Sequence, residues 1–161
     1  SVSVQGIVLI WDPLRFQKER HSDMKIGLDV HGVIDTYPEI FRDFSREWIR
    51  KGFEVHILTG KEWKPTEAKL LKWGVEYTHT FSIVDYHLSR GTEMVKKESG
   101  WWMEETTWNR SKGDYCRRNG ITLHFDNDLK YAEWFPSECN FFLVSETNFR
   151  DCLRVLFPNY Y

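Results

Sequence analysis

Residues 25–35, KIGLDVHGVID, constrain the fold of this chain more than any other stretch. The segment begins as a short apolar run typical of a buried strand, and the run ends on the carboxylate of Asp29. A turn follows at once, since Gly32 is a turn-forming residue. Open α/β sheets bind their ligands at the carboxyl ends of parallel strands. The stretch therefore predicts a functional residue at Asp29.

Strand-like and helix-like segments alternate along the rest of the chain. Apolar runs typical of strands occupy residues 25–29, 53–58, 80–84, 121–125 and 140–144. Helical spacing or helix start and stop residues mark residues 37–51, 65–73, 112–118, 129–135 and 148–157. This alternation predicts an α/β fold, a Rossmann-like three-layer sandwich. Its mostly parallel sheet of about five strands is expected to carry helices on both faces.

The length and composition fit one domain. The chain has 161 residues, of which 41% are hydrophobic and 29% charged, which is enough for a full core. We expect this domain at residues 24–161, because Met24 stands directly before the first clear strand. Residues 1–23 are either an N-terminal extension or an added edge strand, and the sequence leaves both open. Residues 86–111 are the least regular part and are predicted to be a small lid insertion.

Charge and cysteine content argue against several classes of protein. The net charge is −2 and no basic arm is present, which argues against an extended nucleic-acid-binding surface but leaves a local patch open. The three cysteines, Cys116, Cys139 and Cys152, are far apart and odd in number, which favours free, mostly buried thiols in a reducing compartment. No apolar run approaches the length of a membrane span. We therefore expect a soluble, cytoplasmic protein without a membrane partner.

Polar residues follow three of the predicted strands, at Asp29, at Thr59 with Gly60, and at Asp126 with Asn127 and Asp128. Right-handed crossovers bring such strand ends to one edge of the sheet. Two carboxylates from separate strands, a hydroxyl and a nearby lysine suit a phosphate and Mg²⁺. Each motif alone also has an ordinary structural explanation, as a turn or as a helix cap. Taken singly, none of these motifs decides for a phosphate site.

The same residues resemble the motifs of the haloacid dehalogenase-like (HAD) superfamily of phosphatases. Residues 29–34 (DVHGVI) resemble the first motif, whose usual form is Asp-x-Asp-Gly-(Thr/Val), and residues 58–60 (LTG) resemble the second. Residues 112–126 (KGDYCRRNGITLHFD) look like the third and fourth. The resemblance covers roughly residues 24–157. It implies a Mg²⁺-dependent phosphomonoester hydrolase that acts through an aspartyl-phosphate intermediate.

The resemblance also implies a metal site. Asp29 would be both the nucleophile and a Mg²⁺ ligand, and the backbone carbonyl of His31 would supply a second ligand. Asp126 would anchor the ion, with support from Asn127 or Asp128. The remaining histidines show no ligand spacing, so a histidine-based transition-metal site is not expected.

Phosphate binding and proton transfer fall to other matched residues. Thr59 and the Gly60 amide would hold the phosphoryl group, and Lys112 would neutralise its charge. His31 departs from the family, which usually has an acid/base Asp there. Imidazole can do the same work, since its reference pKa of about 6.5 lies near neutrality. If His31 does not do so, the alternative is a phosphotransferase or a non-catalytic HAD-fold module that binds a phosphorylated ligand or a protein partner.

The substrate is the least determined part. Too few residues separate the motifs for a full cap domain, so the resemblance implies a capless or minimally capped enzyme. Its open site suits a large substrate, or closure by a neighbouring subunit. Trp101, Trp102 and Trp108 either stack on a base or pack the lid onto the core. The first motif also looks like that of 5′(3′)-deoxyribonucleotidases, which implies a nucleotide or a phosphorylated nucleic-acid end. A dinucleotide-binding domain is disfavoured, because no Gly-x-Gly-x-x-Gly follows a predicted strand.

Overall fold

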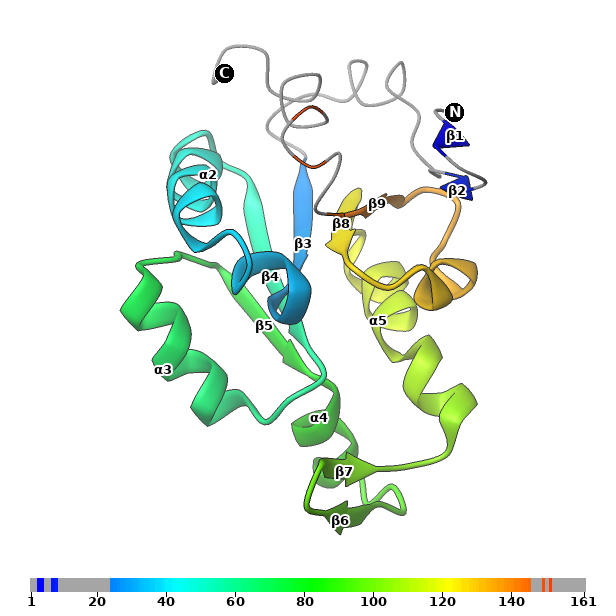
Figure 1. Cartoon of the computed structure of the whole chain (residues 1–161). Helices are drawn as coiled ribbons and strands as arrows, with labels where there is room; N and C mark the ends of the chain where they lie inside the picture. The colour runs from blue at the N-terminus through cyan, green and yellow to red at the C-terminus, as the bar shows by residue number, and fades with distance from the viewer. Residues whose placement is uncertain (1–2, 5–6, 9–23, 146–148, 150, 152–161) are drawn as a thin grey trace.

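A computed structural model describes residues 3–4, 7–8, 24–145, 149 and 151. Five parallel strands form its central sheet, in the order β5-β4-β3-β8-β9 (Figure 1). The strands are β3 (Lys25–Asp29), β4 (Glu54–Thr59), β5 (His79–Ser82), β8 (Leu123–Asp126) and β9 (Asn140–Leu143). The predicted α/β, Rossmann-like fold is confirmed. The order runs outward in both directions from β3, so the chain reverses its direction of winding at the strand that carries Asp29.

Helices cover the sheet on both sides. The helices α2 (Pro38–Arg50) and α3 (Trp63–Trp73) lie on one face and α5 (Glu105–Asn119) on the other (Figure 1). Shorter segments are the π-helical turn η2 (Val30–Ile34), the helix α4 (Ile83–Ser89) and the 3₁₀ helix η3 (Leu129–Trp134). The segment η2 follows β3 directly, so Asp29 stands between a strand and a turn, as predicted.

The core explains why these segments pack as they do. On one face, the β3 residues Ile26 and Leu28 are fully buried in a cluster with aromatic side chains of α2, namely Phe41, Phe44 and Trp48. On the other face, Leu58 of β4 packs in a second cluster with Tyr115 of α5. Because both faces of the sheet are covered, its strands consist of the continuous apolar runs seen in the sequence.

Several boundaries differ from the prediction. Ile83 and Val84, predicted to end a strand, begin the helix α4. The helix α5 begins at Glu105 and holds Lys112 in its middle, whereas the sequence predicted a helix that opens at Lys112. Its start is fixed by Glu104, whose carboxylate accepts hydrogen bonds from the amides of Thr106 and Thr107. The predicted lid at residues 86–111 is correspondingly shorter. It consists of the end of α4 and a hairpin of β6 (Val95–Lys97) and β7 (Gly100–Trp102).

Several expectations concern the ends of the chain. The strands β1 (Ser3–Val4) and β2 (Ile7–Val8) pair with each other in a separate antiparallel sheet, and the rest of residues 1–23 lies outside the described residues. The helix predicted at residues 148–157 also lies outside them, apart from residues 149 and 151. Cys116 and Cys139 are free and buried, as expected, and Cys152 is not described. Among the described residues, no helix is long and apolar enough to cross a membrane.

Candidate active site at the carboxyl edge of the sheet

Three adjacent strands bring the predicted site residues to one edge. In the register of the sheet, Asp29 pairs with Leu58, which precedes Thr59, and Leu28 pairs with Phe125, which precedes Asp126. Asp29, Thr59 and Asp126 therefore end neighbouring strands at the same level. This edge is where parallel α/β sheets place their ligands.

Lys112 reaches this edge from α5 and joins two of the strands. Its Nζ lies 2.9 Å from Asp29 Oδ1 and 3.0 Å from Asp126 Oδ2, and all three side chains are buried. Burial alone would lower the pKa of Lys112, but Asp126 and Asp29 outweigh it and hold the pKa above its usual range. Burial raises the pKa of Asp29 to about 7 against the attraction of Lys112. Asp29 is therefore the group of the three that most readily takes up a proton when no metal is bound.

A close approach of α5 to η3 makes this contact possible. Gly113, the residue after Lys112, lies against the backbone of Trp134, and a Cβ at Gly113 would lie 2.2 Å from the Trp134 carbonyl oxygen. A side chain there would push α5 away from η3. The glycine therefore helps set the depth at which Lys112 enters the site.

Asp126 is held by donors on both of its oxygens. Its Oδ2 accepts from Lys112 Nζ and from His124 Nε2, each at 3.0 Å, and its Oδ1 accepts from the backbone N–H of Asp128 at 3.1 Å. Burial alone would raise the pKa of Asp126, but Lys112 and His124 outweigh it and hold the pKa well below its usual range. Asp126 is therefore an ionised anchor for Lys112.

The sequence analysis gave no individual role to His124, a residue of β8. His124 is fully buried, and its ring stacks on Phe135 at a centroid distance of 4.9 Å. Burial lowers the pKa of His124, so the neutral ring donates to Asp126. Gly27 carried the signal, since a Cβ there would lie 2.6 Å from His124 Nδ1. A glycine inside an apolar strand often marks such a close approach.

Two of the atoms predicted to bind magnesium, Oδ2 of Asp29 and the carbonyl oxygen of His31, lie next to the Asn127 amide. Asp29 Oδ2 and the His31 carbonyl oxygen each lie 3.1 Å from the same terminal atom of the Asn127 amide. With nitrogen in that position, the amide donates to both oxygens. When the amide is rotated by 180°, its oxygen takes that position and lies next to Asp29 Oδ2 and the His31 carbonyl oxygen, which makes a group of three oxygens. Neighbouring ligands of an octahedral Mg²⁺ are about 2.9 Å apart, since each lies about 2.0–2.1 Å from the ion. The donor set of this edge therefore fits Mg²⁺, with Asn127 facing the other two ligands.

Gly32 allows Asn127 to come this close. Its φ of 77° is in the left-handed region, which side chains other than glycine rarely adopt. A Cβ at Gly32 would also lie 2.4 Å from Cγ of Asn127. The glycine of the first motif thus serves both the turn and the close approach of Asn127.

The side chain of His31 lies at the rim of the site. It is 42% exposed, and its Nδ1 lies 3.4 Å from Asp35 Oδ2. Asp35 is itself fixed, since its Oδ1 accepts from the Gly32 N–H at 2.7 Å and from the Thr36 hydroxyl at 3.2 Å. An imidazole oriented through Nδ1 presents Nε2 on the opposite side of the ring. Asp35, which the sequence analysis did not single out, therefore orients the candidate acid/base residue.

The second motif forms another wall of the edge. Thr59 is fully buried, and its Oγ1 accepts a hydrogen bond from the Lys61 N–H at 3.1 Å. Gly60 lies against the ring of Trp108, since a Cβ there would come within 3.0 Å of it. Trp108 Nε1 donates to the hydroxyl of Tyr131 at 3.4 Å. The ring of Tyr131 has Lys112 Nζ 5.2 Å from its centroid. An aromatic pair thus connects the second motif to the lysine.

The three tryptophans of the predicted lid have different surroundings. Trp108 belongs to α5 and packs on the core, while Trp101 donates from Nε1 to Glu62 Oε1 at 2.7 Å. Trp102 on the hairpin is 53% exposed. Packing therefore accounts for Trp108 and not for Trp102.

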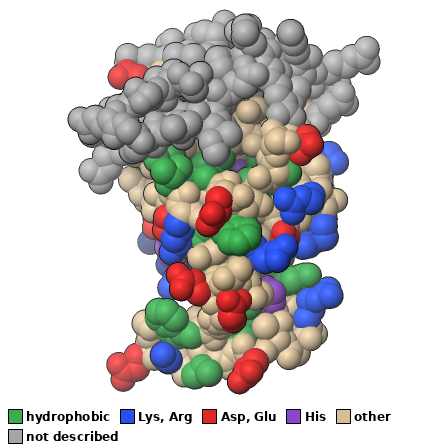
Figure 2. Space-filling view, turned by 90° about the vertical axis from the view of Figure 1, so that its right-hand side faces the viewer, with side chains coloured by type: hydrophobic (Ala, Val, Ile, Leu, Met, Phe, Trp, Pro, Cys, Tyr) green, Lys and Arg blue, Asp and Glu red, His purple; other side chains and the backbone are tan. Residues whose placement is uncertain are grey.

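A small cleft opens beside the predicted ligands. Its volume is about 230 Å³, and its lining includes Gly32, Thr36 and Asn127. Figure 2 views the molecule from the side of α5, and on the described part of this face acidic and basic side chains lie interspersed. The lining does not include Asp29, Thr59 or Lys112, so the cleft lies next to the predicted phosphate-binding residues and not among them.

Comparison with known proteins adds no relative. The chain matches no protein-family model, no curated protein and no solved structure.

Proposed function

We propose that this chain is a Mg²⁺-dependent phosphomonoester hydrolase of the HAD type, with Asp29 as its nucleophile. The arrangement around Asp29 carries the proposal. One of its oxygens contacts Lys112, and the other faces the His31 carbonyl and the Asn127 amide. A carboxylate between a fixed cation and a group of oxygen ligands is suited to attack a phosphate, because both charges can be neutralised there.

The first step transfers the phosphoryl group to Asp29. A carboxylate oxygen attacks phosphorus, the bond from phosphorus to the ester oxygen breaks, and His31 gives its proton to the leaving oxygen. Lys112 offsets the charge that gathers on the phosphoryl oxygens. The Thr59 hydroxyl and the Gly60 amide are the donors expected to position them.

The second step releases phosphate. His31, now neutral, takes a proton from a water molecule, and the water oxygen attacks phosphorus. The bond from phosphorus to Asp29 breaks, which restores the carboxylate and the protonated imidazole. Asp35 acts as a positioning residue, because it holds the ring through Nδ1.

Asp29, the His31 carbonyl and Asn127 would hold the Mg²⁺, which when bound supplies the positive charge that lets an anionic nucleophile approach an anionic phosphate. The expectation that Asp126 is itself a ligand stays a prediction, because both of its oxygens accept hydrogen bonds in the structure.

The substrate class that fits is a nucleotide or a phosphorylated nucleic-acid end. A cleft of about 230 Å³ beside Asn127 is smaller than the roughly 300–1,000 Å³ of typical ligand pockets, and its lining does not include Asp29, Thr59 or Lys112, so most of such a substrate would lie outside it. The hairpin follows α4 at the same edge and presents Trp102, with Lys97 Nζ 5.1 Å from its ring centroid (Figure 1). An exposed ring with a neighbouring cation suits a base and the next phosphate.

Hydrolysis of para-nitrophenyl phosphate, nucleoside monophosphates and 5′-phosphorylated oligonucleotides tests the proposal, with Mg²⁺ and with a chelator. We expect turnover only with Mg²⁺, and a rate at least about 10³-fold lower for Asp29→Asn. Asp43→Asn is the matched control, because Asp43 is exposed on α2. Activity that survives Asp29→Asn would overturn the assignment of the nucleophile.

Trapping the intermediate separates the alternatives. With ³²P-labelled substrate, His31→Ala is expected to accumulate label that hydroxylamine releases, as an acyl phosphate should, and Asp29→Asn should acquire none. A labelled wild type that passes the group only to an acceptor other than water would indicate a phosphotransferase. Neither label nor turnover with any substrate would favour a non-catalytic module.

A further inference from the structure

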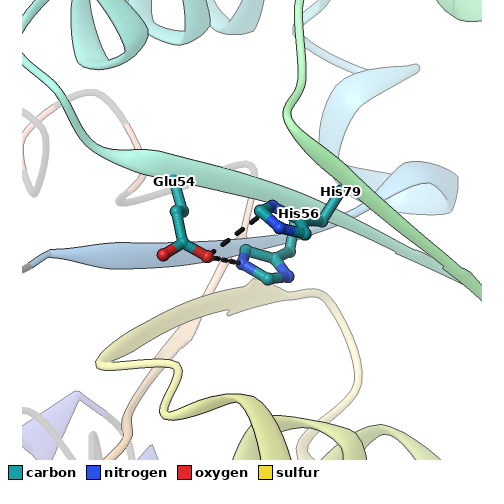
Figure 3. Close-up of side chains that lie close together, drawn as sticks. All are labelled: Glu54, His56 and His79. Atoms are coloured by element: carbon teal, nitrogen blue, oxygen red, sulfur yellow. Dashed lines mark hydrogen bonds and ion pairs between the residues drawn. The ribbon is translucent and has the colours of Figure 1, made fainter.

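A second cluster of metal-ligating side chains lies at the opposite end of β4. Glu54, His56 and His79 each offer one ligand atom, and these atoms all lie within 4.8 Å of one another (Figure 3). Glu54 Oε1 is 2.9 Å from His56 Nε2 and 3.6 Å from His79 Nδ1. Glu54 begins β4 and Thr59 ends it, so about 16 Å of strand separates this cluster from the phosphate site.

The sheet assembles this cluster from residues far apart in sequence. Glu54 and His56 are two residues apart on β4 and therefore point to the same face. His56 pairs directly with His79 of β5 in the register, and their rings stack at a centroid distance of 4.2 Å. His56 is 1% exposed, whereas the His79 side chain is 48% exposed at the edge of the sheet. The cluster thus has one buried histidine and one that can turn.

His56 also has the support that a metal-binding histidine needs. Its Nδ1 lies 2.7 Å from the hydroxyl of Tyr115 on α5. A neutral imidazole carries one hydrogen, and Tyr115 can either donate to Nδ1 or accept from it. When Nδ1 holds the hydrogen and donates to Tyr115, the lone pair of Nε2 is directed at the cluster. Metal-bound histidines nearly always make such a second hydrogen bond, which fixes the ring.

We propose that Glu54, His56 and His79 bind a divalent transition metal, with Zn²⁺ as the best match. Two imidazole nitrogens and one carboxylate oxygen form a ligand set that Zn²⁺ uses with a fourth, open position, while Mg²⁺ prefers oxygen alone. Tetrahedral ligands about 2.0–2.1 Å from zinc lie about 3.3 Å from each other. The Glu54 distances are close to this value, and rotation of the exposed His79 side chain brings in the third ligand. The ion would link the edge strand β5 to β4.

Calorimetric titration of the full chain with Zn²⁺ tests the site. The proposal predicts tight binding of one equivalent that His79→Ala weakens at least tenfold. Tyr115→Phe keeps all three ligands and removes only the hydroxyl, and it should weaken binding about 10–100-fold, as loss of a supporting hydrogen bond does elsewhere. Since the His79 side chain is half exposed, replacing it by alanine should not disturb the packing of the core. Bound Co²⁺ should show the intense visible bands of a four-coordinate site in wild type and lose them in His79→Ala.

Asp29→Asn is the control for zinc bound at the other edge. This variant should still bind one equivalent of Zn²⁺ tightly and show the same Co²⁺ spectrum as wild type. The result does not depend on whether the chain hydrolyses phosphate esters. Three outcomes would overturn the proposal. The first is that zinc does not bind at about 100 micromolar, the range of adventitious sites. The second is that wild type and His79→Ala bind zinc with equal affinity. The third is that Asp29→Asn loses the tightly bound zinc while His79→Ala keeps it.

Discussion

Replacing Lys112 by methionine tests the electrostatic arrangement of the carboxyl edge. The substitution keeps most of the side-chain volume and removes the positive charge that contacts both Asp29 and Asp126. Breaking a buried ion pair by removing one partner costs about 3–5 kcal/mol, because the other charge stays buried. For a chain of this size, that corresponds to a fall in melting temperature of roughly 6–20 °C. The loss should lie near the lower end at neutral pH, since Asp29 already has a pKa of about 7 and can take up a proton.

The pH dependence sharpens this prediction. A carboxyl whose folded pKa is raised binds more protons in the folded state than in the unfolded one, so stability falls as pH rises between the two values. In the variant, the folded pKa of Asp29 should rise further without Lys112. The difference between wild type and Lys112→Met should therefore grow above pH 7, by at most about 1.4 kcal/mol per pH unit.

Urea unfolding followed by circular dichroism, with a chelator present, measures both quantities. Lys69→Met is the matched control, because Lys69 is exposed on α3, and it should change the free energy of unfolding by less than about 0.5 kcal/mol. A loss below about 1 kcal/mol for Lys112→Met, or one that does not grow between pH 7 and pH 9, would contradict the buried-charge reasoning.

Three further variants test single contacts. Gly113→Ala should destabilise the protein by at least about 1–3 kcal/mol in urea unfolding, because its Cβ meets the Trp134 backbone. Asn127→Ala should raise the Mg²⁺ concentration that half-activates hydrolysis, while the neighbouring Asp128→Ala should raise it less. Glu104→Gln should be less stable than wild type above pH 5. This difference should vanish as pH falls toward 2, because hydrogen bonds from Thr107 and Thr106 hold the pKa of Glu104 at about 2.

The sheet could be predicted because each of its strands leaves a strong local pattern. Ile26 and Leu28 belong to an apolar run since both faces of β3 are covered, and Asp29 marks the point where that cover ends. Strand order then follows from general handedness rules, and it places Asp29, Thr59 and Asp126 at one edge. The order of the motifs was therefore enough to bring these residues together.

Contacts that depend on how elements pack could not be predicted in this way. The start of α5 was missed because Glu104 is an unusual capping residue and the first turns of the helix lack an apolar period. Spacing rules for metal ligands search short intervals, so they did not connect His56 with His79, which strand pairing sets side by side. The position of His124 could not be predicted for the same reason. It depends on Gly27 of the neighbouring strand β3, where a side chain would collide with the imidazole ring.

The helix α5 supports both edges of the sheet at once. Lys112 and Tyr115 are three residues apart and therefore project from the same side of the helix. Lys112 contacts the carboxylates at the carboxyl edge, and Tyr115 contacts His56 near the amino edge. Since a helix is stiff over one turn, a shift of α5 along the sheet would disturb both contacts together. The close packing of Gly113 on Trp134 resists such a shift, and it lies between the two side chains. A single glycine contact therefore helps to set the geometry of both the proposed phosphate site and the proposed zinc site.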